Sequence, residues 1–144
     1  MKPSFWKANN KSLNFFRGRS IFNPDTEKYR TLSTNDLYGG SYRIFSKVFE
    51  TFGIEFTYAN MSKLEETENL IKTNTKLIWI ETPTNPTLSN IDIAACASLA
   101  KKYHAILAVD NTFASPALQN PINLGADIVM HSVTKFIGGH SDVV

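Results

Sequence analysis

The sequence has little cysteine, no long apolar run and no metal-ligand spacing, and each absence excludes a kind of protein. Cys96 is the single cysteine among 144 residues, so no disulfide framework can form within the chain. No uninterrupted apolar stretch is long enough to span a bilayer. His131 and His140 are not spaced with other ligands, so we predict no metal site. We expect a soluble cytoplasmic protein with no membrane partner.

Acidic residues are missing from the start of the chain. The charged residues among positions 1–22 are all basic: Lys2, Lys7, Lys11, Arg17 and Arg19. The whole chain has 15 basic and 13 acidic residues and a formal net charge of +2, so the remainder is net negative. This balance gives no general polyanion-binding signature.

We therefore predict an atypical basic leader over residues 1–32 and a domain over residues 33–144. The plainest interpretation of the leader is a partly disordered segment, or the abnormal start of a truncated gene. A basic stretch without acids is also typical of an organelle transit peptide. Interleaved basic and aromatic residues are typical of nucleic-acid contact. We favour the first interpretation and expect no nucleic-acid partner.

Beyond the leader, apolar residues recur with helical and strand periods in turn. The pattern predicts helices at about 40–52, 62–72 and 91–103, and strands at 54–58, 76–81, 105–109 and 127–130. Ser33 to Asp36 reads as a loop, and 82–90 and 111–124 read as connections. Strands that alternate with helices indicate an α/β domain, with a mostly parallel sheet covered on both faces.

Polar side chains follow the last two predicted strands. Asp110 ends one apolar run, and Lys135 follows the next one, with Ser132 and Thr134 near it. A lysine amine can form a Schiff base with an aldehyde cofactor, while hydroxyls bind its phosphate. An acid beside the ring nitrogen is the usual partner of pyridoxal phosphate. Because strand ends bind ligands in open α/β sheets, these residues predict a pyridoxal-phosphate site.

Four segments, at 36–43, 79–87, 109–113 and 132–142, resemble those of a known family in the same order. Together they are similar to the Cys/Met-metabolism pyridoxal-phosphate enzymes, which include cystathionine γ-synthase, cystathionine γ- and β-lyases and methionine γ-lyase. The resemblance covers roughly Ser33 to Val144, which look like the middle of a longer family member. It implies part of the large domain of the fold type I pyridoxal-phosphate-dependent transferases.

The resemblance implies roles for the residues at the predicted strand ends. Lys135 would form the Schiff base and then remove the α-proton of the substrate. Asp110 would pair with the ring nitrogen, with Thr112 near the ring, and Ser132 and Thr134 would bind the phosphate. Without the resemblance, Lys135 would read as a solvated surface lysine and Asp110 as a cap after a strand.

Two residues upstream also receive roles from the resemblance. Tyr38 would stack on the cofactor ring and assist proton transfer, and Asn85 would lie beside the cofactor's phenolic oxygen. Their plainer interpretations are a half-buried loop aromatic and a turn residue before proline. Glu81 ends a predicted strand at the same edge, and we expect it to structure the site.

The resemblance implies a trans-sulfuration enzyme of cystathionine γ-synthase or γ-lyase type, acting on sulfur amino acids as a homo-oligomer, typically a tetramer. The family's upstream Gly–Met pair, the tyrosine–arginine pair from a neighbouring subunit and the C-terminal small domain have no counterpart here. The alternative is a truncated, catalytically inactive fragment that folds poorly alone or associates with a full-length relative. A nucleic-acid module acting through the leader is a more distant third interpretation.

Overall fold

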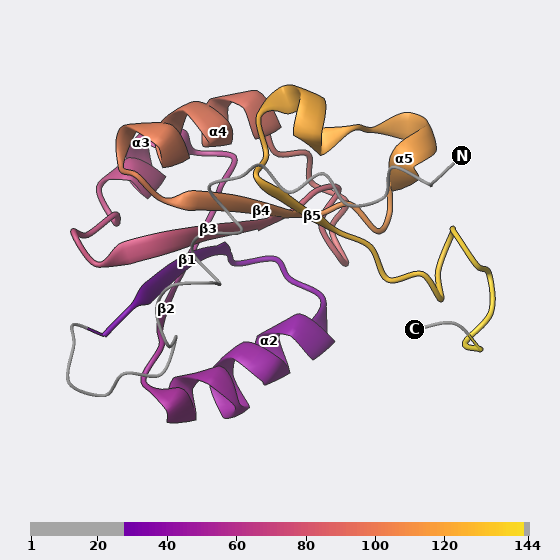
Figure 1. Cartoon of the computed structure of the whole chain (residues 1–144), viewed down its shortest axis with the longest axis horizontal. Coiled ribbons are helices and arrows are strands. Elements are labelled where there is room, and N and C mark those ends of the chain that lie inside the picture. Colours follow the sequence, from indigo (N-terminus) through magenta and orange to yellow (C-terminus); the bar gives the residue numbers. More distant parts are fainter. Residues whose placement is uncertain (1–27, 143–144) are drawn as a thin grey trace.

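Five strands form one parallel sheet in the computed structural model, which describes residues 28–142 (Figure 1). The strands are β1 (Arg30–Thr34), β2 (Glu55–Ala59), β3 (Thr75–Glu81), β4 (Ile106–Asp110) and β5 (Ile128–Met130). Their order in the sheet is β2-β1-β3-β4-β5. The order of strands reverses between β1 and β3, and an open α/β sheet binds ligands beyond the strand ends at such a point.

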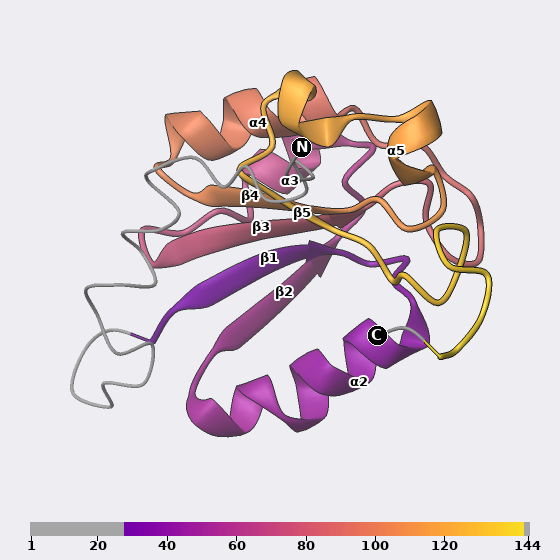
Figure 2. The same ribbon diagram turned by 45° about the vertical axis from the view of Figure 1, so that its right-hand side comes forward.

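Helices cover both faces of this sheet. The helix α2 (Gly39–Lys47) joins β1 to β2 and lies on one face, and α3 (Leu64–Glu68) and α4 (Ile93–Lys102) lie on the other (Figures 1 and 2). The short helix α5 (Ser115–Leu118) and the 3-10 turn η2 (Pro121–Leu124) connect β4 to β5. The predicted α/β fold with a parallel sheet is confirmed. No helix among residues 28–142 is long and apolar enough to cross a membrane.

The main core lies between the sheet and α4. Leu32, Ile78, Ile80, Leu107 and Val109 come from three adjacent strands and have no exposed surface. They pack in one cluster with residues of α4 that include Cys96. Cys96 is fully buried, and burial raises the pKa of its thiol to about 12. A core of this density fixes where β1, β3 and β4 end, which positions the site.

Aromatic residues fill the other side of the sheet, beneath α2. The Phe45 ring stacks on Phe56 of β2 at 4.8 Å between ring centroids and meets Trp79 of β3 edge-on at 5.5 Å. Tyr42 packs on Tyr58 at 5.4 Å. Aromatic pairs in these arrangements contribute beyond the area that they bury. They hold α2, and with it the segment before α2, against the sheet.

One continuous helix over residues 40–52 was predicted, and that prediction is wrong. The helix α2 ends at Lys47, and a 3-10 turn, η1 (Phe49–Phe52), follows it. Of the apolar residues that recur here at helical spacing, Phe45 is buried, whereas Ile44, Val48 and Phe52 are 49%, 44% and 56% exposed. Helical periodicity shows which apolar residues share one face of a helix, but not how much of that face is buried. Here α2 presents only part of its apolar face to the sheet. Gly53 does end the segment with φ 83, as a left-handed cap requires.

The first strand was missed. Residues 33–36 were expected to form a loop, but Ser33 and Thr34 belong to β1, which starts at Arg30. Its buried side chains include Thr31, Ser33 and Thr34, so no apolar alternation marks it. The Arg30 guanidinium donates to Thr57 Oγ1 at 2.6 Å and pairs with Glu55, both in β2. Most of the predicted leader, residues 1–27, lies outside the described residues, and the division at residue 32 stays a prediction.

The other predicted strands are confirmed as β2 to β5, within a residue at each end. Ser62 and Glu65 are spaced like a capping box, but Ser62 does not cap α3. The Ser62 hydroxyl donates to Asn60 Oδ1 at 2.6 Å instead of capping the helix, and the helix starts at Leu64. By contrast, α4 has a true N-cap, because the Asp92 carboxylate accepts from the backbone N–H of Ala95 at 2.9 Å.

Candidate active site

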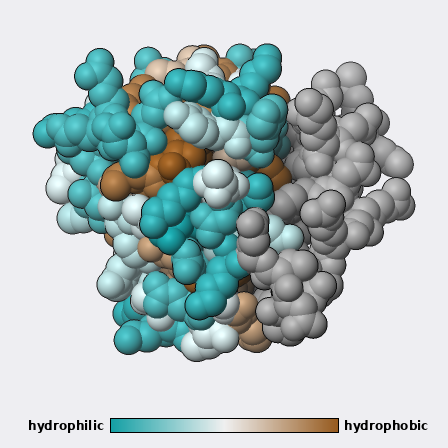
Figure 3. Space-filling model, turned by 90° about the vertical axis from the view of Figure 1, so that its left-hand side faces the viewer, coloured by the Kyte–Doolittle hydropathy of each residue, from teal (hydrophilic) through white to brown (hydrophobic). Residues whose placement is uncertain are grey.

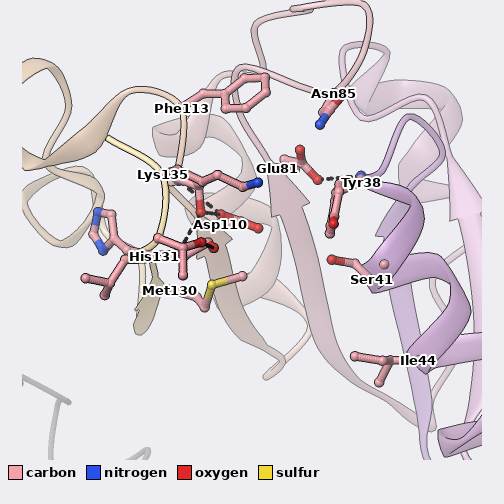
Figure 4. A pocket seen from close by; sticks show the side chains of 15 residues that line it. Tyr38, Ser41, Ile44, Glu81, Asn85, Asp110, Phe113, Met130, His131 and Lys135 are labelled. Atoms are coloured by element: carbon pink, nitrogen blue, oxygen red, sulfur yellow. Dashed lines mark hydrogen bonds between the residues drawn. The ribbon is translucent and has the colours of Figure 1, made fainter. Parts of the chain in front are cut away.

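A cavity of about 390 Å³ opens where β3, β4 and β5 end and α2 begins (Figure 4). Its walls include all seven residues that the sequence analysis assigned to a cofactor site: Tyr38, Asn85, Asp110, Thr112, Ser132, Thr134 and Lys135. The fold therefore brings them together from four separate connections. This happens because parallel strands end at one edge of the sheet and the loops after them converge there.

Asp110 is the buried acid of the cavity, with 5% of its surface exposed. Its Oδ1 accepts from Thr112 twice, from the backbone N–H at 3.0 Å and from the hydroxyl at 2.5 Å. Burial raises the pKa of Asp110, whereas the bonds from Thr112 and the nearby His131 oppose that shift. No described residue donates to Oδ2, so this oxygen can meet a cationic N–H in the cavity.

Thr112 also ties the end of β4 to the segment after β5. Its Oγ1 accepts from the backbone N–H of Ser132 at 2.8 Å while it donates to Asp110. The one hydroxyl therefore sets the acid of β4 and the start of the lysine segment relative to each other. Thr112 therefore has a structural role, through its hydrogen bonds to Asp110 and Ser132, in addition to lining the cavity.

Ser132, Thr134 and Lys135 come from the irregular segment after β5. The hydroxyl oxygens of Ser132 and Thr134 are 3.0 Å apart, so both can point at one anion. The backbone N–H of Lys135 donates to the carbonyl of Ser132 at 3.1 Å, which closes a turn. The Lys135 side chain reaches across the cavity toward Glu81 and Tyr38 in Figure 4. A primary amine thus enters a cavity that the hydroxyl pair and the Tyr38 ring also line.

Tyr38 stands at the opposite wall, directly before α2. Its ring is 47% exposed, and its backbone N–H donates to Glu81 Oε2 at 2.8 Å. The ring lies against Gly40, where a Cβ atom would come within 2.4 Å of Tyr38 Cε1. A glycine at position 40 therefore leaves the room that this ring position needs.

Asn85 lines the cavity from the connection after β3, which packs on the connection after β1. The carboxylate of Asp36 accepts from the Thr84 hydroxyl at 2.5 Å, and also from Thr87. These bonds lower the pKa of Asp36, the bond from Thr84 most of all. They hold the segment of Asn85 next to that of Tyr38 without using either residue.

Glu81 is more central to the cavity than its position at a predicted strand end indicates. It is 5% exposed, and in the sheet register it is the direct neighbour of Asp110. A signal was present, because Glu81 and Asp110 each end an apolar run in the same way. Ser41, Phe113, Met130 and His131 also line the cavity without having been singled out as site residues, since only folding brings their segments to one edge.

His131 is read most simply as a structural residue. Its Nε2 lies 3.1 Å from the side-chain nitrogen of Asn111, and burial lowers the pKa of the imidazole. In Figure 4 its ring points away from the cavity. Within residues 28–142, no three His, Cys, Asp or Glu side chains form a group that could hold a metal ion.

Comparisons with known proteins show which family has this sequence and fold. The family model described as Cys/Met metabolism PLP-dependent enzyme matches residues 23–144. The chain is 55% identical to cystathionine γ-lyase from Bacillus subtilis (strain 168) over 111 residues, which cover 77% of the chain and 29% of that enzyme. It is 53% identical to cystathionine γ-synthase from Mycobacterium leprae (strain TN) over 110 residues, 76% of the chain and 28% of that enzyme.

The fold is also found in a solved structure. The crystal structure of cystathionine γ-lyase from Lactobacillus plantarum, complexed with L-serine, matches 86% of this chain and 32% of that one, with 44% identity and a TM-score of 0.80. The chain thus spans less than a third of the length of these relatives. The family match covers most of the chain and includes all seven predicted site residues. This chain belongs to the family of Cys/Met metabolism PLP-dependent enzymes.

Proposed function

We propose that this chain carries the lysine-bearing part of the cofactor site of a trans-sulfuration enzyme. Its reaction is of the cystathionine γ-lyase or γ-synthase type, on a small sulfur amino acid. The observation that carries the proposal is the convergence of a lysine, a hydroxyl pair, a buried acid and an aromatic ring on one cavity. Relatives named as γ-lyase and γ-synthase match at 55% and 53% identity, so similarity favours neither reaction over the other.

Pyridoxal phosphate is the cofactor of the family, and the donor set of the cavity fits it. The Ser132 and Thr134 hydroxyls suit a phosphate, and the buried Asp110 suits a protonated ring nitrogen. Lys135 suits an aldehyde, and the Tyr38 ring suits the face of a planar ring. When bound, the cofactor supplies an electron sink that stabilises negative charge at the substrate α-carbon.

Each of the chain's own residues then has a physical task. Asp110 would hold a protonated ring nitrogen of the cofactor, because an ionised carboxylate in a buried site favours a cationic partner. The Lys135 amine would act as the base that takes the proton from the α-carbon of the substrate. Tyr38 would pack on the cofactor ring, and Asn85 would donate a hydrogen bond to a cofactor oxygen. Thr112 keeps Asp110 and Ser132 in register with each other.

The test is titration of the purified chain with pyridoxal phosphate, followed by visible absorbance. We expect a band in the wild type that Lys135→Ala loses, and Lys101→Ala, an exposed lysine of α4, serves as the matched control. Assays for γ-elimination from cystathionine would follow. A band that survives in Lys135→Ala, or that Lys101→Ala also loses, contradicts the assignment of Lys135.

One observation supports a second candidate function, that of a catalytically inactive fragment. The chain spans 29% of the length of a γ-lyase relative. In this alternative the chain is catalytically inactive and folds poorly alone or associates with a longer relative. It predicts no Lys135-dependent band for the isolated chain, and a band that appears when the longer relative is added. We also propose homo-oligomerisation, which the family implies, and a cytoplasmic location.

A further inference from the structure

We propose that Glu81 is a positioning residue, which sets the place of the Tyr38 ring by holding the Tyr38 backbone N–H. The inference rests on the proposed function, because the ring position matters through the cofactor that it would face. Glu81 itself touches no reacting atom in this scheme. It acts from the end of β3 on the residue that opens α2.

The bond between the two residues joins elements that are far apart in the chain. Glu81 Oε2 accepts from the Tyr38 N–H at 2.8 Å, across 43 positions in sequence. Tyr38 is the N-cap residue of α2, and its own side chain caps nothing. A carboxylate supplied by β3 therefore satisfies a backbone donor at this helix start, where negative charge is favourable.

Once the Tyr38 backbone is held, few positions are open to its ring. It lies over Gly40, where a Cβ would approach Cε1 to 2.4 Å and Cδ1 to 3.0 Å. The backbone anchor at Glu81 and the contact at Gly40 act on opposite ends of one residue. Loss of the anchor frees the backbone at position 38, and the half-exposed ring follows it.

The surroundings of Glu81 also disfavour its ionised form. Burial raises the pKa of Glu81 to about 7; the backbone N–H groups of Tyr38 and Asn85 oppose the shift, and the charges of Asp110 and Asp36 add to it. Removing this buried charge offsets part of the cost of leaving the Tyr38 N–H without its acceptor. The positioning role can therefore be tested with variants that stay folded.

The experiment compares Glu81→Met, which keeps the shape but has no acceptor oxygen, with Glu81→Gln, which keeps one. The first readout is hydrogen exchange at the Tyr38 amide in the full chain without cofactor, measured by NMR. We expect exchange that is roughly fivefold faster or more in Glu81→Met, with rescue in Glu81→Gln. The control Asp92→Ala removes another carboxylate that accepts a backbone N–H, at the start of α4, and should leave Tyr38 unchanged.

A second readout covers the case in which Glu81→Met unfolds. In the wild type, the Tyr38 amide proton shift should move as Glu81 titrates, and Glu81→Gln should abolish that movement. Among the described residues, the other titratable groups around the cavity are Asp36, Asp110, His131, Lys135 and the Tyr38 phenol itself, and all of them remain in the variant. A third readout is the visible circular dichroism of added pyridoxal phosphate, which reports ring orientation and should weaken in Glu81→Met only.

The outcomes separate this inference from the proposed function. If the Tyr38 amide is as protected in Glu81→Met as in the wild type, or its shift titrates identically in Glu81→Gln, the inference is overturned. The Lys135-dependent absorbance band would then still stand on its own. If no such band forms, the proposed function fails, whereas the amide result without cofactor remains decisive for Glu81.

Discussion

Glu81 and Asp110 are two acids on neighbouring strands with the same degree of burial and different partners. Asp110 accepts two bonds at one oxygen from Thr112, whereas Glu81 accepts from the backbone of Tyr38. Burial raises the pKa of both carboxyl groups. Two like charges on adjacent strands disfavour simultaneous ionisation. At the residue scale, then, the cavity contains an acid whose protonation changes near neutral pH.

The raised pKa of Glu81 predicts a specific pH dependence of stability. Between its ordinary pKa of 4.5 and about 7, the folded state keeps a proton that the unfolded chain has released. The free energy of unfolding therefore falls as pH rises through this window, by up to about 3 kcal/mol. Urea denaturation at pH 5 and pH 8 should show this fall in the wild type and a smaller one in Glu81→Gln. Parallel behaviour of the two proteins would rule out the assigned pKa, and Glu66→Gln, an exposed control, should match the wild type.

Gly40 permits a second prediction at this scale. Gly40→Ala should leave the free energy of unfolding unchanged or raise it by up to about 1 kcal/mol, because alanine favours helix and the half-exposed Tyr38 ring can move aside. The displaced ring should weaken pyridoxal-phosphate binding about fivefold, the value of one aromatic contact. Gly39→Ala is the matched control, since nothing lies within 4 Å of its Cβ. Equal affinities of the two variants would show that Tyr38 does not need Gly40.

At the scale of elements, the site depends on how β4 and β5 are joined beyond their ends. Asp110 pairs with Met130 in the last register of the two strands, and β5 is only three residues long. The chain after β5 is irregular, so few ladder bonds hold it. The bond from the Ser132 N–H to Thr112 Oγ1 extends the connection between the two elements past the sheet.

Thr112→Val should therefore loosen the segment after β5. It leaves the Ser132 N–H without its acceptor and Asp110 without one donor, at a cost of about 1 to 3 kcal/mol in the free energy of unfolding. We also expect faster hydrogen exchange at the Ser132 amide. Thr112→Ser keeps the hydroxyl and should behave like the wild type in both measurements. The idea fails if valine and serine at position 112 give the same Ser132 exchange rate.

For the whole molecule, the exposed apolar side chains matter most. Leu118 and Phe136 are 85% and 71% exposed, and both belong to the connections after β4 and β5. Figure 3 shows apolar side chains gathered on another face, between polar surfaces above and below. The strands β2 and β5 each have a single neighbour in the described sheet. Exposed apolar surface and open sheet edges both favour association.

We predict that the isolated chain associates in solution. Sedimentation velocity should show species larger than the 16.1 kDa chain, and Phe136→Glu or Leu118→Glu should shift the distribution toward the monomer. Lys101→Glu changes charge on an exposed face of α4 and should have no such effect. A soluble monomer with one cooperative thermal transition would contradict the prediction.

The fold class, and which residues would line the candidate cavity, were accessible from the sequence by itself. Four predicted strands are confirmed, because alternating and continuous apolar runs report which residues avoid water. Asp110 ends one apolar run, Lys135 follows another with Ser132 and Thr134 near it, and the four family-like segments assigned roles to these residues. Apolar runs and short motifs are properties of neighbouring residues in the chain, so they can be recognised without the folded structure.

Tertiary structure alone decided the rest. The strand β1 escaped detection because its buried threonines and serine owe their burial to neighbours on both sides, not to their own polarity. The end of α2 at Lys47 depends on how much of its apolar stripe meets the sheet. Glu81 gains its bond to Tyr38, and its raised pKa, only when residues 43 positions apart meet at one edge. The sequence by itself determined which side chains are available, and packing decided which of them face each other, because burial and hydrogen bonding depend on distance in space.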